Sequence, residues 1–148
     1  MSFGCGVDAR HFLKFAFLTI VLLAFGCSDA AREREAKDTC IDLAQQFTRA
    51  LTSRDYERAF SMVSAARRGK ITLQSLQEGF ERIIPQDWGD TEPIEAALLP
   101  GGRAAYQEDD VAIIYVSIYG EVYSEAVTIS FVLEDDAPMV GGVEFGRP

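Results

Sequence analysis

The side chains best suited to nucleophilic, metal-binding or acylation chemistry are few in this chain: one histidine, His11, and three cysteines. His11 and Cys5 precede an eleven-residue run over 15–25 that is apolar apart from Thr19, and Cys27 follows directly after Gly26. Arg10, His11 and Lys14 form a basic patch before this run, which is typical of a signal peptide, whereas a membrane-spanning helix needs about 20 apolar residues. We therefore expect residues 1–26 to be a signal peptide that is removed before Cys27.

The residues around this cut predict a lipid anchor. Leu23-Ala24-Phe25-Gly26-Cys27 resembles a bacterial lipoprotein signal, in which the Cys becomes the first mature residue and carries acyl chains such as palmitate. Ala24 and Phe25 depart from the usual aliphatic and small residues, and Ala24-x-Gly26 also satisfies an ordinary secretory rule. A lipoprotein signal and an ordinary secretory signal would both be cleaved between Gly26 and Cys27, and they differ in whether lipid is attached. The resemblance implies lipid attachment at Cys27, a tether over residues 27–35, and a location in the bacterial cell envelope facing the periplasm or exterior.

Without residues 1–26 the chain has no histidine, which excludes a His-based triad, a Cys–His pair and a His-containing metal site. Cys40 then has no histidine to lower its pKa and no second free cysteine for a disulfide, so we expect a buried helix residue. The acidic runs at 109–110 and 134–136 lack a calcium-ligand spacing. The sequence predicts no catalytic residue, no metal and no cofactor.

The length and the net charge of the mature chain limit the classes of partner that it can bind. The mature 122 residues suit one domain, which we place at 36–148. They carry 12 basic and 22 acidic residues, a net charge of −10. A field of that sign repels phosphate backbones and anionic headgroups, so we expect no nucleic acid and membrane contact only through the N-terminal lipid. The one basic cluster, over 67–70, is a solvated loop or a contact for lipid headgroups or an acidic partner.

Apolar spacing predicts the elements. Positions three and four apart give a helix from Ala36 to Leu51, a shorter one over 56–63, and a third that Thr72 caps and Pro85 stops. Alternation and β-branched residues then predict strands over 94–99, 111–119, 122–133 and 139–145, with turns near 100–102, 120–121 and 134–138. Gly141 and Gly142 indicate a bulge or close packing. The predicted fold is α+β, with three N-terminal helices packed on a curved antiparallel sheet of three to four strands.

Residues 36–146 resemble the nuclear transport factor 2-like superfamily. The resemblance rests on the hinge sequence over 47–60, with its Asp55-Tyr56 pair, and on the strands around 112–116 and 126–131. It implies a sheet that wraps the helices into a cone. The chain departs from many members at Pro138-Met139, where they carry a Trp opening the final strand. The superfamily contains isomerase-like enzymes as well as non-catalytic binding modules, so the fold does not choose the function.

An isomerase-type mechanism in the cone would need a carboxylate base facing an acid such as a tyrosine. Strand parity places Tyr123 and Glu125 on the same face as Val127, Ile129, Phe131 and Leu133, which we take as inward. Trp88 would line or cover such a pocket. The alternative is that Tyr123 and Glu125 lie at a solvated strand end and that Trp88 is a packing residue.

The opposite parity predicts an aromatic and polar outer face of the sheet, formed by Tyr115, Ser117, Tyr119, Thr128 and Ser130. Such uncharged, tyrosine-rich patches are typical of protein interfaces, and superfamily members often pair through this face. The alternative is an ordinary hydrated sheet face.

We therefore expect a non-catalytic lipoprotein whose domain binds a protein partner or a small ligand, with a homodimer as one form of partner. The alternatives are an isomerase or hydratase that uses the cone pocket, and an immunity protein that neutralises a basic toxin.

Overall fold

The computed structural model describes residues 34–99, 107–120 and 123–147. The signal peptide, Cys27, most of the tether, the break at 100–102 and position 121 of the predicted hairpin turn lie outside these ranges. The chain divides into compact units at 1–35 and 36–148, and the fold below is that of the second unit.

The helices form where the apolar spacing predicts them. The first helix is described over 34–52, and its buried residues are Cys40, Ala44, Phe47, Thr48, Ala50 and Leu51. The helix α2 (Tyr56–Ser61) begins at Asp55, whose side chain accepts a hydrogen bond from the Arg58 backbone amide at 3.1 Å. The helix α3 (Leu73–Ile83) begins with a capping box between Thr72 and Ser75. Local capping therefore sets where α2 and α3 start.

The helical part reaches further along the chain than predicted. Two 3₁₀ turns, η1 (Ala65–Arg67) and η2 (Gln86–Trp88), follow α2 and α3. Pro85 ends α3 as predicted, because the helix stops at Ile83, but a further 3₁₀ turn, η2, starts directly after Pro85, which lies at φ −58°. Helical structure thus extends to Trp88, past the middle of the 148 residues, so the helices are not confined to an N-terminal part.

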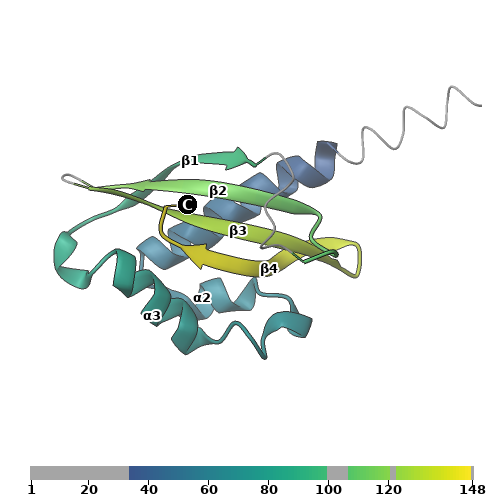
Figure 1. Cartoon of the computed structure of the whole chain (residues 1–148), viewed down its shortest axis with the longest axis horizontal. Helices are drawn as coiled ribbons and strands as arrows, with labels where there is room; N and C mark the ends of the chain where they lie inside the picture. Colours follow the sequence, from purple (N-terminus) through teal and green to yellow (C-terminus); the bar gives the residue numbers. More distant parts are fainter. Residues whose placement is uncertain (1–33, 100–106, 121–122, 148) are drawn as a thin grey trace, which may run out of the picture. The chain divides into compact units, whose positions relative to one another are not determined.

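Four antiparallel strands form a curled meander in the order β1-β2-β3-β4 (Figure 1). Their bounds are β1 Glu92–Leu98, β2 Ala112–Tyr119, β3 Ser124–Glu134 and β4 Ala137–Phe145. Asp135 and Asp136, at φ +52° and +62°, make the two-residue turn between β3 and β4, as expected for a type I′ hairpin. Pro138 is tolerated because β4 is an edge strand, where a missing amide hydrogen can face away from the sheet.

The predicted bulge is present. The pairing of β3 with β4 shifts between Ser130 and Phe131, and the extra residue is Gly141. A Cβ at Gly141 would lie 2.8 Å from Val132 Cγ1, so only glycine allows Val132 to pack there. Val132 is therefore buried, whereas Leu133, which we expected to face inward, is 52% exposed beside the turn. The bulged edge is also paired, because Ser64 N donates to Val140 O and Val140 N donates to Met62 O, each at 3.0 Å.

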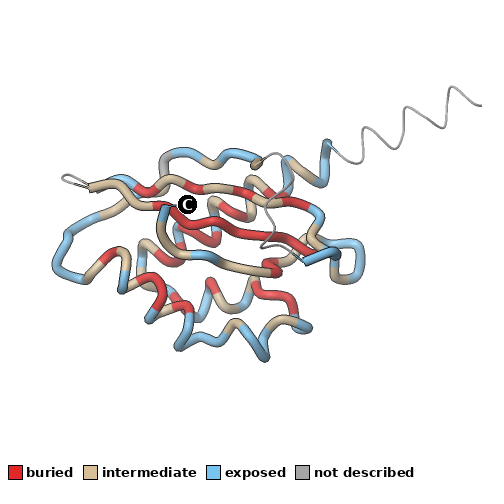
Figure 2. Tube along the Cα trace, in the orientation of Figure 1, coloured by how far each residue is buried: buried red, intermediate tan, exposed pale blue. Residues whose placement is uncertain are grey.

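One continuous core joins the helices to the inner face of the sheet (Figure 2). On β2 the residues Ala112, Ile114, Val116 and Ile118 are buried, as their parity predicts. Phe47, Phe80, Ile129 and Phe131 are fully buried, in agreement with the apolar spacing. Phe60 is only half-buried, and the Arg68 guanidinium lies 5.5 Å from its ring. Leu73 is exposed because it lies in the first turn of α3, where Thr72 and Ser75 also face solvent.

Candidate binding surfaces

Two of the three residues predicted for a pocket meet at one end of the sheet. Trp88, in η2, and Tyr123, just before β3, have ring centroids 4.3 Å apart with an interplanar angle of 49°. Trp88 is 42% exposed, while Tyr123 packs against the core. Glu125 lies two residues along the same strand face, about 7 Å away by strand geometry, and is half-buried. The two rings therefore pack on each other, and Trp88 stays partly exposed to solvent.

The phenol of Tyr123 is held in a tight setting. Its oxygen is buried and has no hydrogen-bond partner among the described residues. Burial raises the pKa of Tyr123, and the charge of Arg54 offsets part of that rise. A Cβ at Gly120 would lie 2.5 Å from Tyr123 Cζ, so glycine at 120 lets the ring fold back over the hairpin. The phenol therefore stays protonated at neutral pH and is a donor without an acceptor.

A polar network that the sequence analysis missed centres on Arg54. Its guanidinium donates to the Tyr56 hydroxyl at 3.1 Å and to the carbonyl oxygen of Ile84 at 2.9 Å, and it lies 5.1 Å from the centroid of the Phe80 ring. Tyr56 donates in turn to Glu81 Oε1 at 3.2 Å. Arg54 thereby ties the hinge between the first two helices to the C-terminal end of α3. No local pattern signals this contact, because Ile84 lies 30 residues away.

The carboxylate in this network is poorly suited to act as a base. Hydrogen bonds from Gln86 and Gln77 lower the pKa of Glu81, and Tyr56 adds to the effect. A general base is most effective when its pKa lies near the working pH, which for Glu requires a raised value. The arrangement around Glu81 thus favours a fixed negative charge that accepts hydrogen bonds.

A shallow groove of about 570 Å³ lies beside the aromatic pair. It is lined by Thr52, Ser53, Arg54, Gln86, Gly89, Asp90, Thr91 and Glu92. Its walls are polar and carry charges of both signs, with the guanidinium of Arg54 directed towards Tyr56 and the end of α3. Such a groove can hold a small polar molecule by hydrogen bonds, whereas ligand pockets are usually lined mainly by hydrophobic and aromatic side chains, which are not among these residues.

The outer face of the sheet is the second candidate surface. We define it as the side of the strands away from the helices, and no described helix covers it in Figure 1. Tyr115 and Ser117 are half-buried there, and Tyr119 is 46% exposed. The pairing places Glu92 opposite Tyr119, Glu95 opposite Ser117 and Glu144 opposite Thr128, so these glutamates share this face and are exposed.

Two residues predicted for this face are not accessible. Thr128 and Ser130 are each 2% exposed in the single chain. Thr128 is short and lies between Tyr115 and Glu144 of the neighbouring strands. Ser130 is covered by Asp110, whose Oδ1 accepts a hydrogen bond from Ser130 Oγ at 3.1 Å. The surface that a partner could reach therefore comprises Tyr115, Ser117 and Tyr119, with the glutamates around them.

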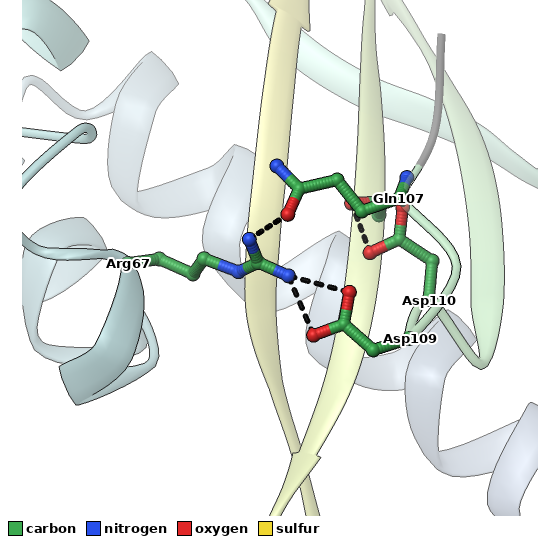
Figure 3. A network of polar contacts seen from close by, with 5 residues as sticks. Arg67, Gln107, Asp109 and Asp110 are labelled. Carbon is green, nitrogen blue, oxygen red and sulfur yellow. Dashed lines mark hydrogen bonds and ion pairs between the residues drawn. The ribbon is translucent and has the colours of Figure 1, made fainter. Parts of the chain in front are cut away.

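Two of the three basic residues over 67–70 make contacts within the domain, and residues 68–70 are exposed to solvent, as expected for a loop. The Arg67 guanidinium donates hydrogen bonds to both carboxylate oxygens of Asp109, at 2.7 Å each, and to the side-chain oxygen of Gln107. Figure 3 shows these contacts. Arg68 donates to the carbonyl oxygen of Val63 at 3.1 Å. The Arg67 contacts hold the segment before β2 in place, and Asp110 of that segment covers Ser130.

The remaining candidates for chemistry in the described ranges are the thiol of Cys40 and clusters of metal-binding side chains. Cys40 is 1% exposed, and burial raises the pKa of its thiol, as expected for a core residue. Residues 34–99, 107–120 and 123–147 contain no group of three or more side chains arranged to hold a metal ion. Within the same ranges, no helix has both the length and the hydropathy needed to cross a membrane. No protein-family model, curated protein or solved structure matches the chain.

Proposed function

We propose that this protein is a bacterial envelope lipoprotein that is acylated at Cys27 and carries one nuclear transport factor 2-like domain over 36–148. In this proposal residues 1–26 are removed, residues 27–35 are the tether, and the three helices pack inside the curved sheet as in the cone of that superfamily. The domain binds a protein partner by surface complementarity and makes or breaks no bond. The helix-then-meander order and the continuous core support the fold assignment.

The observation that carries the binding role is the outer face of the sheet. Tyr115 and Tyr119 stand on a face that no described helix covers, and Tyr119 is 46% exposed. Tyrosines offer a large contact area at a small cost in side-chain entropy and are enriched at interface centres. The candidate pocket supports an enzyme less well, because Trp88 and Tyr123 pack on each other and the nearby Glu81 has a lowered pKa. An immunity protein remains compatible with the same surface.

The lipid anchor is tested by mass spectrometry and by substituting the cysteines one at a time. Mass spectrometry of the mature N-terminus is expected to show a lipid-modified Cys27, and Cys27→Ser is expected to release the protein from membranes. The matched control is Cys40→Ser, which changes a buried thiol and should leave the protein membrane-bound. An unmodified N-terminus at Cys27 would contradict the lipoprotein assignment.

Protein binding is tested by photo-crosslinking of the full chain in its own cell envelope. A photo-reactive amino acid in place of Tyr119 is expected to crosslink to a protein, and the same group in place of Asp42, which is exposed on the first helix, is not. A third position, Trp88, reports on the other end of the domain. If neither position 119 nor position 88 crosslinks to any protein, the binding role is wrong.

A further inference from the structure

We infer that the partner segment that docks on the outer face of the sheet is a basic, lysine- or arginine-rich stretch of protein. The inference rests on the proposed protein-binding function and names the chemistry of the partner. It is carried by the distribution of charge over the two halves of the domain and by where the strand register puts the glutamates.

The net negative charge of the domain is concentrated in the half of the chain that contains the strands and the loops between them. Residues 34–91, which form the helices, contain nine acidic and nine basic residues, whereas residues 92–146 contain eleven acidic residues and one basic residue, Arg103. The four strands hold five glutamates and neither lysine nor arginine. A surface of one sign steers and selects partners of the opposite sign.

The pairing of the strands places three of these acidic residues on the outer face of the sheet. Glu92 and Glu95 on β1, and Glu144 on β4, border the tyrosines of β2 on the outer face, and all three glutamates are exposed. A guanidinium or ammonium group over Tyr115 or Tyr119 would gain a cation–π contact and would have a carboxylate within reach across one or two strand spacings of about 4.8 Å. Aromatic centres with a charged rim are the usual arrangement of a transient interface.

The same pattern disfavours a second copy of this chain as the occupant. In a two-fold interface the outer face of one copy would contact the outer face of the other, which would bring the glutamates of the two copies together. No lysine or arginine of the four strands offsets this repulsion, because the strands contain neither residue. Arg147, at one corner of the face, is bonded to the carbonyl oxygen of Ser124 at 2.7 Å.

The test measures binding of a defined probe to the full processed chain in neutral detergent. The probe is a short fluorescent peptide rich in arginine and lysine, with a matched peptide carrying glutamine at those positions. Replacing two carboxylates of the face, Glu95→Gln with Glu144→Gln, is expected to weaken binding of the basic peptide about tenfold. Tyr115→Ala is expected to weaken it as well.

The control removes the same two charges from exposed helix positions, Asp42→Asn with Glu78→Gln, and is expected to change binding less than about twofold at physiological ionic strength. Equal weakening by both pairs, or equal binding of the glutamine peptide, would overturn the inference. In the cell, the segment that crosslinks at position 119 is expected to be basic. An acidic or neutral crosslinked segment, or crosslinks at position 88 alone, would refute this inference while leaving the binding function standing, whereas no crosslink at either position refutes both.

Discussion

At the scale of single residues, Arg54 shows how the domain supports a strained position. Its backbone lies at φ +60°, in the left-handed region, which costs a residue with a side chain about 1–2 kcal/mol. The guanidinium bonds to Tyr56 and Ile84 and contacts the Phe80 ring, and together these contacts hold the hinge in that conformation. The residue therefore joins two helical segments that have no sequence signal for each other.

We expect Arg54→Ala to lower the free energy of unfolding by about 2 kcal/mol, because the hydrogen bonds to Tyr56, Ile84 and Pro85 and the ring contact are lost. The control is Arg58→Ala, an exposed arginine on α2, which should stay within about 0.5 kcal/mol of the parent chain. Urea unfolding followed by circular dichroism measures both. If the two variants unfold at the same urea concentration, the contacts of Arg54 contribute nothing net.

At the scale of elements, the contact between α3 and β4 depends on a glycine. A Cβ at Gly79 would lie 2.4 Å from two ring carbons of Phe145, so α3 and β4 approach closely only because this position has no side chain. Gly79 is buried in the middle of the helix, where glycine itself is unfavourable by about 1 kcal/mol relative to alanine. Packing between the elements therefore overrides helix propensity here.

Gly79→Ala is expected to destabilise the domain by about 1–2 kcal/mol, since overpacking costs more than the gain in propensity. In a Phe145→Ala background the clash is absent, and the same substitution should change sign and stabilise by up to about 1 kcal/mol. Gly69→Ala, with open space around its Cβ, is the control. Thermal unfolding of the parent chain, Gly79→Ala, Phe145→Ala and the double variant forms the cycle. An unchanged sign of the Gly79→Ala effect in the Phe145→Ala background would contradict this packing.

At the scale of the whole domain, the helices and the sheet share one core, so stability does not divide between them. Phe47 on the first helix, Phe80 on α3 and Phe131 on β3 are all fully buried in the same cluster. A domain of this size unfolds with a free energy of about 5–15 kcal/mol. Loss of one large core side chain is therefore felt by every element.

Phe47→Ala is expected to cost about 3–5 kcal/mol, whereas Phe60→Ala, at a half-buried position, should cost clearly less. Urea unfolding should show a single transition for both variants. Unfolding of Phe47→Ala at the same urea concentration as the parent chain would mean that the first helix does not pack as described.

Local patterns in the sequence were enough to predict the elements and much of the core. Thr72 predicts a helix start, and the alternation along β2 predicts which face is buried, because both depend on residues within one turn or one strand. The excess of acidic residues in the sheet half is likewise a property of the sequence alone. The signal before Cys27 is also local, and it stays a prediction.

Only the tertiary structure decided which polar residues can reach a partner. Thr128 and Ser130 have the parity of an outer face, yet neighbours on other segments bury them. The contacts of Arg54 with Ile84 and of Arg67 with Asp109 join residues 30 and 42 positions apart. Sequence periodicity predicts on which face of its helix or strand a residue lies. What covers that side depends on strand register and on loop placement, and these are set by the packing of the whole chain.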